Sequence, residues 1–253
     1  MNPPTASTNG QDTFAGGTTP AATAFVLAGG ESSRMGRDKA LLELPSGETM
    51  LRRALHTAKQ AAGKVVLVAP EGRYPELQAE FQTISDIHPG RGPLSGIHAA
   101  LCYSATEWNL VLGVDSPRVT PELLRFLLTV AAGAAAALAV VPRVAGRLHT
   151  VCAAYRKAFA QTAERDLLAA GLNSASTGFA AGSRHHLPRR QEQDLEREPR
   201  RGTRIERLLA QVPSRILEEE ELRRAGFGAE LFANVNTPDD FAALGFARGD
   251  QSP

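Results

Sequence analysis

The stretch from Phe25 to Leu42, FVLAGGESSRMGRDKALL, decides the fold of this chain. It begins with a short apolar run, as expected of a buried strand, and a glycine pair and small polar residues follow at once. Gly29 and Gly30 lack a Cβ, so the backbone can approach a ligand closely and its N–H groups can surround an anion. Arg34 and Lys39 add positive charge. The pattern predicts a strand that leads into a loop binding the phosphates of a nucleoside triphosphate; the alternative is a tight turn with surface cations.

Two common phosphate-binding loops are excluded by their spacing. A Walker loop, G-x-x-x-x-G-K-[ST], does not match because the residues after Gly36 read RDK, with no Ser or Thr in place. A dinucleotide fingerprint, G-x-G-x-x-G, is broken at Glu31. The loop therefore belongs to another class.

The composition indicates a globular protein. A chain of 253 residues with 43% apolar and 22% charged residues can bury a large core. Its formal net charge of +1 argues against binding nucleic acid through bulk electrostatics. Cys102 and Cys152 lie in apolar runs, which predicts buried thiols in a reducing compartment. No stretch approaches about 18 uncharged apolar residues. We therefore expect a cytoplasmic protein that binds neither nucleic acid nor membrane.

The sequence predicts one domain with polar segments around it. Residues 1–22 are rich in Thr, Ala, Gly, Pro and Ser and lack a basic start followed by an apolar core, which predicts a disordered tail rather than a signal peptide. The domain is expected over 23–246, with a mobile insertion at 171–202, where mixed charge is dense and leucines are few. Residues 247–253 are expected to form a C-terminal tail.

Hydrophobic patterning after the first strand predicts alternating helices and strands. A helix capped by Thr49 and ended by Gly63 precedes the continuous apolar run Lys64–Ala69, which is typical of a strand buried in a parallel sheet. Further strands are expected at 81–85, 108–114, 134–141, 151–155 and 215–217. Further helices are expected at 98–102, 120–130, 156–170 and 218–225, and from 203. The predicted fold is α/β, a three-layer Rossmann-like arrangement with a mostly parallel sheet and an antiparallel element around 151–155.

An acidic residue follows one of these strands directly. The strand expected at 108–114 delivers Asp115 at its carboxyl end. Ligands of open α/β sheets bind beyond the carboxyl ends of the strands, so a carboxylate there is well placed to hold a divalent metal. The competing interpretation is that Asp115 only caps the turn that follows.

Two other segments carry residues suited to a binding site. The glycines of GRGPLSG at 90–96 let a loop approach a ligand, and Pro93 suits a helix start; the alternative is a plain junction between loop and helix. Asn234 and Asn236 alternate about Val235, so both amides should point to one face while Val235 packs on the other. His149 is interpreted as structural rather than catalytic.

The sequence LAGGESSRMGRDKALL resembles the signature L-A-G-G-x-S-x-R-M-G-x-D-K-x-L-L of nucleotidyltransferases that act on the molybdenum cofactor, above all the guanylyltransferases of MobA type. GPLSG at 92–96 and FANVNTPDD at 232–240 resemble two further family segments, G-P-L-x-G and F-x-N-V-N-T-P-x-D. The resemblance implies transfer of GMP from GTP to the terminal phosphate of the molybdopterin cofactor, with release of pyrophosphate. Such a reaction needs positioning and charge neutralisation more than acid–base chemistry.

The resemblance also implies roles for particular residues. Arg34, Lys39 and Asp115 would be catalytic, with Mg²⁺ held by Asp115. Asn234 and Asn236 would lie on the side of the cofactor substrate. The residues expected to bind the nucleotide are Leu27, Ala28, Gly29, Gly30, Lys39, Asp86, Leu94, Ser95 and Asp115. The expected partners are GTP, the molybdopterin cofactor, and proteins that deliver the cofactor or molybdoenzymes that accept it.

The chain departs from the family pattern at two positions, and three alternatives stay open. Val68 stands where guanylyltransferases of this type place an asparagine, and Thr150 where the family usually has a proline. A cytidylyltransferase acting on the same cofactor is one alternative, although such enzymes more often carry L-A-A-G. A sugar-phosphate nucleotidyltransferase is another. A noncatalytic nucleotide-binding module would keep the loop and lose the metal ligand, so the presence of both Lys39 and Asp115 speaks against it.

Overall fold

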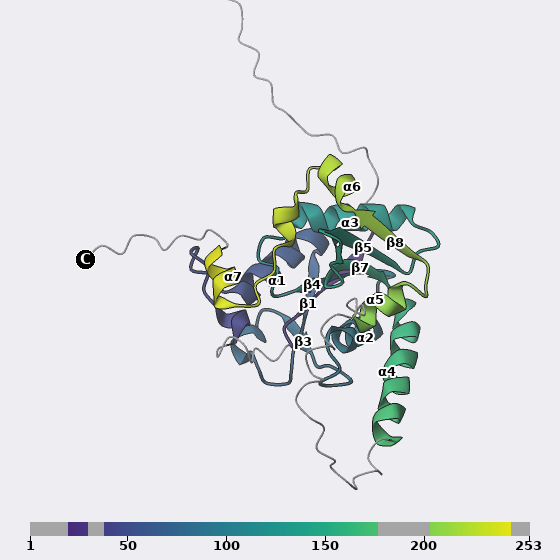
Figure 1. Cartoon of the computed structure of the whole chain (residues 1–253). Helices are drawn as coiled ribbons and strands as arrows, with labels where there is room; N and C mark the ends of the chain where they lie inside the picture. The colour runs from purple at the N-terminus through teal and green to yellow at the C-terminus, as the bar shows by residue number, and fades with distance from the viewer. Residues whose placement is uncertain (1–19, 30–37, 177–202, 244–253) are drawn as a thin grey trace, which may run out of the picture.

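The computed structural model describes residues 20–29, 38–176 and 203–243, which form one sheet flanked by helices (Figure 1). Within this part of the chain the sheet has eight strands, in the order β3-β2-β1-β4-β7-β5-β6, with β8 paired to β5. The pairs that β1 makes on both sides are parallel. The predicted α/β class with a mostly parallel sheet is confirmed.

The first strand lies at the centre of the parallel part. β1 (Ala22–Leu27) runs parallel to β2 (Lys64–Val68) and to β4 (Trp108–Gly113). β7 (Cys152–Arg156) lies antiparallel between β4 and β5 (Ala139–Val144), so the predicted antiparallel element is confirmed. The remaining strands are β3 (Gln82–Ile84), β6 (Arg147–Leu148) and β8 (Ser214–Glu218).

Two long helices begin at the caps that the sequence predicted. The Thr49 hydroxyl accepts a 3.2 Å hydrogen bond from the Arg52 N–H at the start of α1 (Met50–Ala62). Thr120 caps α3 (Pro121–Gly133) in the same way. The other helices are α2 (Pro93–Tyr103), α4 (Phe159–Ser176), α5 (Arg204–Leu209), α6 (Glu219–Arg224), α7 (Pro238–Ala243) and the 3₁₀ helices η1 (Lys39–Leu41), η2 (Pro75–Leu77) and η5 (Ala229–Phe232). Among the residues that the structure describes, no helix has the length and apolar character needed to cross a membrane.

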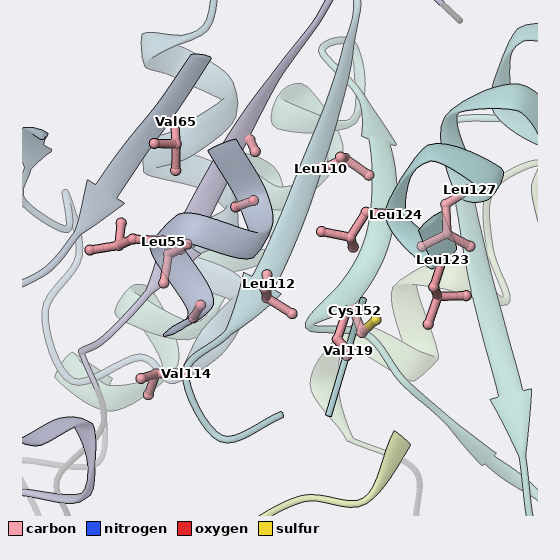
Figure 2. Close-up of a cluster of buried hydrophobic side chains, with 14 of the residues drawn as sticks. Leu55, Val65, Leu110, Leu112, Val114, Val119, Leu123, Leu124, Leu127 and Cys152 are labelled. Carbon is pink, nitrogen blue, oxygen red and sulfur yellow. The ribbon is translucent and has the colours of Figure 1, made fainter. Parts of the chain in front are cut away.

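The sheet is covered on both faces, with α1 and α3 on one and α2, α4 and α5 on the other. Alternate residues of β4 serve the two faces: Leu110 and Leu112 belong to the α1/α3 cluster, and Val111 belongs to the α2/α4 cluster. Figure 2 shows the first cluster, in which Leu55 of α1 and Leu124 of α3 are fully buried. Burying each such side chain stabilises the fold by about 1.5–3 kcal/mol. The core therefore holds the sheet rigidly and leaves its carboxyl edge for a site.

Two predicted boundaries in the second half of the chain were wrong. The strand expected at 134–141 is β5, which starts at Ala139, because the alanines before it form turns at the end of α3: Ala134 and Ala137 donate backbone hydrogen bonds of 3.1 and 3.0 Å to residues three positions earlier. Alanine favours helical over extended backbone. The helix expected at 156–170 is α4, which starts at Phe159. It starts later because Arg156 is the last residue of β7, where it pairs with Trp108 of β4. It also runs on to Ser176, into the predicted insertion, and residues 177–202 lie outside the described part of the chain.

The two cysteines differ in exposure. Cys152 is buried, and burial raises the pKa of its thiol to about 12. Cys102 is exposed on α2, with its Sγ 3.3 Å from Nε2 of His98, so the prediction of two buried thiols was wrong for this one. An apolar sequence context cannot tell which side of a helix a cysteine occupies. Ala22, assigned to the N-terminal tail, is the first residue of β1.

Candidate active site

The carboxyl ends of β1 and β4 lie side by side at one edge of the sheet (Figure 1). The Val114 N–H donates to the Leu27 carbonyl at 3.3 Å, and the Ala28 N–H donates to the Val68 carbonyl at 2.9 Å. The chain leaving β1 therefore runs beside the chain leaving β4. Leu27, Ala28 and Asp115, three of the predicted site residues, are brought together at this edge.

A cation and a carboxylate face each other there. Nζ of Lys39 lies 3.5 Å from Oδ2 of Asp115, and each side chain is 19% exposed. The Asp115 carbonyl accepts a 2.8 Å hydrogen bond from the Val235 N–H, which ties the end of β4 to the last predicted motif. Partial burial makes this pair less screened than a surface ion pair. The two residues that the sequence singled out most strongly thus meet in one place.

Gly113 makes room for the carboxylate. A Cβ placed on Gly113 would lie 2.6 Å from Oδ1 of Asp115 and 2.9 Å from Cγ2 of Val151, closer than real Cβ contacts come. The Gly113 N–H also donates a 2.6 Å hydrogen bond to the Val151 carbonyl. A side chain at this position would force either the Asp115 carboxylate or the Val151 side chain to move. The site therefore needs a glycine at the end of β4.

The residues around Asp115 suit a metal that a substrate brings with it. Within the described residues no group of three or more His, Cys, Asp or Glu side chains is arranged to hold a metal ion. Mg²⁺ is often bound through one or two carboxylates, with substrate phosphates and waters completing its octahedron. A single, partly exposed carboxylate with a lysine beside it fits this mode. Asp115 is the residue that would hold the metal.

Lys39 is the first residue of the short helix η1, and residues distant in the sequence bind the side chain that caps this helix. Oδ1 of Asp38 accepts a 3.1 Å hydrogen bond from the Ala40 N–H and so caps η1. Its Oδ2 accepts from the Arg73 guanidinium at 2.9 and 3.1 Å and from the Tyr74 hydroxyl at 2.9 Å. The Asp38 carboxylate is occupied by these donors. Neither Arg73 nor Tyr74 was among the predicted site residues.

The second predicted segment forms a network around Asp86. Oδ1 of Asp86 accepts hydrogen bonds from the Ser95 hydroxyl and, at 3.3 Å, from the His88 N–H. Gly92, with φ of 74°, is the N-cap of α2. The first turn of this helix packs against β1, since a Cβ on Gly96 would lie 3.3 Å from the Leu27 side chain. The segment therefore borders the same edge of the sheet.

Leu94 and Ser95 are both buried. The Leu94 side chain is 1% exposed and packs in the α2/α4 cluster, and Ser95 is fully buried. Leu94 as a whole therefore offers almost no surface that a nucleotide could contact in this structure. Ser95 contributes by hydrogen bonding to Asp86.

The two asparagines border a cavity of about 430 Å³. Both asparagines line the cavity, and Val235 between them is fully buried. Oδ1 of Asn234 accepts a 2.9 Å hydrogen bond from the hydroxyl of Ser116, the residue after Asp115. The cavity is lined by Val144, Ala145, Arg147, His149, Ala229, Phe232, Ala233, Asn234, Asn236 and Asp240.

His149 is part of this cavity wall. Its ring lies 4.8 Å from the Phe232 ring, centroid to centroid, and the backbone N–H of His149 donates to the Pro142 carbonyl at 2.9 Å. Burial lowers the pKa of His149, and the neighbouring Arg147 lowers it further, while Asp115 acts in the opposite direction. The imidazole is therefore held in its neutral form near pH 7. Arg147, which no sequence motif marked, joins the wall because β6 follows β5 on the same side, whereas Phe232 begins the FANVNTPDD segment and lies at the end of η5.

Of the predicted site residues, Gly30 and Arg34 lie outside the described residues. Gly29 is the last described residue after β1, and it is exposed. Arg73 and Tyr74 follow the carboxyl end of β2, the neighbour of β1. That position was the signal that would have marked them, because the carboxyl ends of parallel strands share one edge of a sheet.

A lysine facing a carboxylate at the carboxyl edge of a mostly parallel sheet, directly after a glycine-rich signature, is the arrangement of a nucleotidyltransferase. Comparison with known proteins agrees. Residues 24–185 match the family model of the MobA-like NTP transferase domain. The chain belongs to this MobA-like nucleotidyltransferase family.

Relatives support the assignment, and a solved structure shares the fold. A relative from Pelotomaculum thermopropionicum is 39% identical over 58% of this chain and 70% of its own length, and one from Deinococcus radiodurans is 31% identical over 91% and 96%. Both are named "Probable molybdenum cofactor guanylyltransferase". The crystal structure of molybdopterin-guanine dinucleotide biosynthesis protein A from Archaeoglobus fulgidus has a TM-score of 0.65 at 24% identity, covering 88% of this chain and 96% of that chain.

A second solved structure has the same fold with another activity. CMP:2-keto-3-deoxy-manno-octonic acid synthetase complexed with CTP has a TM-score of 0.61 at 16% identity, covering 88% of this chain and 96% of that one. At this identity the likeness shows a shared fold alone. The fold is thus common to nucleotidyltransferases with different nucleotides, and base choice must come from the site.

Proposed function

We propose that the protein transfers GMP from GTP to the terminal phosphate of the molybdopterin cofactor and releases pyrophosphate. The observation that carries the proposal is the Lys39–Asp115 pair, 3.5 Å apart at the carboxyl edge of the sheet. The backbone of Asp115 and the hydroxyl of Ser116 join this pair to the asparagine-lined cavity. A triphosphate site and an acceptor site therefore adjoin each other. The names of the relatives supply the substrates.

The chemistry is a single phosphoryl displacement. An oxygen of the acceptor phosphate forms a bond to the α-phosphorus of GTP, the bond from that phosphorus to the α–β bridging oxygen breaks, and pyrophosphate leaves with the electron pair. The attacking oxygen is already anionic, so the protein needs no general base. Its residues bind the two substrates in line and neutralise charge.

Lys39 and Asp115 divide this work. The Lys39 ammonium binds the pyrophosphate portion of GTP, where charge accumulates as the bond breaks. Asp115 would hold the divalent metal that nucleotidyltransferases of this kind typically need, and we infer that the metal is Mg²⁺, which would neutralise negative charge on the phosphates.

The cavity beside Asp115 suits the acceptor. Its volume of about 430 Å³ lies within the usual range for small-molecule sites. The amides of Asn234 and Asn236 offer donors and acceptors for a heterocycle that has both. Arg147 supplies a cation for a phosphate, and Phe232 supplies an apolar face.

Base choice is assigned to Asp86. Val68 is 3% exposed and packs with Phe25 and Val66, so it offers no polar group to a base. The Asp86 carboxylate accepts hydrogen bonds, and guanine presents two adjacent donors, its ring N–H and its 2-amino group, where cytosine presents only its 4-amino group. This chemistry favours GTP over CTP.

The test is turnover with GTP, CTP and ATP on molybdopterin-loaded protein, followed by pyrophosphate release and by the mass of the dinucleotide formed. We expect GTP to be used at a rate at least about tenfold higher than CTP, a difference of about 1.4 kcal/mol in transition-state binding. Equal or better use of CTP would replace the guanylyltransferase assignment with the cytidylyltransferase alternative. No transfer with any nucleotide would exclude both.

We further infer a cytoplasmic location and contact with proteins that supply the cofactor or accept the product. The location is supported by two unpaired thiols, at Cys102 and Cys152. Protein contacts are supported by the chemistry of the acceptor, a large anionic cofactor that passes between carriers.

A further inference from the structure

Two residues that no signature motif marks converge on the residue before the catalytic lysine. The Arg73 guanidinium donates to Oδ2 of Asp38 through Nε at 3.1 Å and Nη2 at 2.9 Å. The Tyr74 hydroxyl donates to the same oxygen at 2.9 Å. The other carboxylate oxygen accepts from the Ala40 N–H at 3.1 Å. Asp38 is thus held by four donors from two segments of the chain, residues 73–74 and Ala40, and its orientation is fixed.

The arrangement is largely shielded from water. Tyr74 is 3% exposed, and the side chains of Arg73 and Asp38 are 28% and 21% exposed. Burial raises the pKa of Tyr74, and the hydrogen bond to Asp38 raises it further, so the hydroxyl stays protonated and remains a donor throughout the physiological range. Charge-assisted hydrogen bonds in such a setting are about twice as strong as neutral ones.

The same tyrosine touches both sides of the signature segment. Its hydroxyl lies 3.4 Å from the Ala28 carbonyl, at the end of β1, as well as 2.9 Å from Asp38. Ala28 and Asp38 flank residues 29–37 in the chain. Arg73 and Tyr74 lie in the turn between β2 and η2, where the Arg73 N–H donates to the Pro70 carbonyl at 3.2 Å and the Tyr74 carbonyl accepts from the Leu77 N–H at 3.1 Å. The Tyr74 hydroxyl therefore contacts the signature at two residues, Ala28 and Asp38.

The effect passes from Asp38 to Lys39. Asp38 is the N-cap of η1, and Lys39 is the first residue of that helix. The Leu42 N–H donates to the Lys39 carbonyl at 3.2 Å, which closes the single turn. Fixing the cap therefore fixes the direction from which the Lys39 side chain approaches Asp115.

We propose that Arg73 and Tyr74 are positioning residues of the nucleotidyltransfer reaction, which hold Lys39 in place for the triphosphate by clamping Asp38. The inference rests on the proposed function for the identity of the nucleotide. The anchor, defined as Arg73 and Tyr74 together, does not touch the substrate. It acts by removing the freedom that Lys39 would otherwise lose when the nucleotide binds.

The competing explanation is a clamp that serves stability alone. A purely structural clamp would lower the melting temperature on mutation without a specific effect on nucleotide binding. A positioning anchor would weaken binding of GTP, and the loss would depend on the presence of Lys39. A double-mutant cycle separates the two explanations.

The experiment measures the dissociation constant of GTP in the presence of Mg²⁺, together with kcat, KM and the melting temperature, for Arg73→Gln, Arg73→Lys and Tyr74→Phe. We expect Arg73→Gln to weaken GTP binding about tenfold. Arg73→Lys should recover part of the loss, because it keeps the charge without the bidentate geometry. Tyr74→Phe should produce a smaller loss in the same direction, since it removes one hydrogen bond.

The cycle and a matched control decide the outcome. In a Lys39→Ala background, Arg73→Gln should cause no further loss of GTP binding. Arg52→Gln is the control, because Arg52 forms another bidentate pair, donating to the two Glu80 carboxylate oxygens at 3.0 and 3.4 Å. This substitution should leave GTP binding unchanged. The same tenfold loss with and without Lys39, or a lower melting temperature with unchanged GTP binding, would overturn the proposal. If Arg73→Gln does not fold, GTP binding is measured in the same double-mutant cycle with Tyr74→Phe and Lys39→Ala.

Failure of the anchor and failure of the proposed function give different results. A wild-type enzyme that prefers CTP would change the nucleotide used in the cycle and leave its logic intact. A wild-type protein that binds GTP and transfers nothing would refute the proposed reaction, while the binding cycle would still decide whether the anchor acts through Lys39.

Discussion

Replacing Gly113 with alanine should disable the site through the position of one carboxylate. The added Cβ would lie 2.6 Å from Oδ1 of Asp115 and 2.9 Å from Cγ2 of Val151. An oxygen at 2.6 Å must move by roughly 0.8 Å to reach ordinary van der Waals contact. The Asp115 side chain can rotate at the cost of its 3.5 Å contacts with Lys39 and Ser116, whereas Val151 is bound through its carbonyl to the Gly113 N–H at 2.6 Å. The carboxylate should therefore be the group that moves.

The magnitude follows from that displacement. A misplacement of about 1 Å in a catalytic group costs on the order of a hundredfold in rate, or about 2.7 kcal/mol. Overpacking against Val151 should also cost about 1–3 kcal/mol of folding stability. We therefore expect Gly113→Ala to fold, with a lower melting temperature, and to lose kcat by about two orders of magnitude while GTP binding falls less.

The assay is steady-state turnover with GTP alongside calorimetric melting. Gly133→Ala is the matched control: Gly133 is the last residue of α3, its φ is not positive, and a Cβ there would meet nothing within 4 Å. Its activity should equal that of the wild type, and its stability should be equal or slightly higher. Wild-type kcat in Gly113→Ala would show that the reaction tolerates a displaced carboxylate, and the argument for Asp115 as metal ligand would fail.

The remaining predictions concern the charged pair, the outlying segments and pH. Asp115→Asn should fold normally and lose turnover by several orders of magnitude, with its metal requirement moved to higher Mg²⁺; retention of more than about a tenth of the activity, a cost under ~1.4 kcal/mol, would contradict the metal assignment. Lys39→Ala should weaken triphosphate binding as well as rate, and added Mg²⁺ should not restore either. Deleting 1–19 or shortening 177–199 should leave GTP binding within about tenfold of wild type, because neither composition can bury enough apolar surface to offset chain entropy. Burial lowers the pKa of His149, so the unfolded chain binds the proton more readily and stability should fall as the pH drops below about 6.5. Melting curves between pH 5 and 7.5 should show a weaker pH dependence for His149→Gln; an unchanged slope would assign the effect elsewhere.

Local patterns predicted the elements of the fold well. The caps at Thr49 and Thr120 start helices because a side-chain oxygen meets a free N–H three residues on, which depends on neighbouring residues alone. The run 64–69 became β2 because continuous apolar sequence of this length suits a strand covered on both faces. The alanines at 134–138 were misassigned because alanine is apolar enough for a strand while its backbone preference is helical.

The site was predicted in parts. Asp115 and Lys39 were each identified from what stands next to them in the chain, a strand end and a glycine-rich signature. Leu94 was assigned to the nucleotide from its motif, yet the residue is buried in the core, because a motif does not state which of its residues face the site and which pack behind it. Arg73 and Tyr74 escaped notice because their partner, Asp38, lies far back in the sequence.

The sequence by itself determined the class of fold, the start of the helices, the glycine-rich signature and the family, since each of these depends on short runs of residues and on backbone preferences within them. Tertiary structure alone decided which polar groups meet. It paired Lys39 with Asp115 across 76 positions and Ser116 with Asn234 across 118. Such contacts follow from the order of strands in the sheet, which brings the carboxyl ends of β1, β2 and β4 to one edge. The strand order is selected by the burial of the whole core, which no short stretch of sequence specifies.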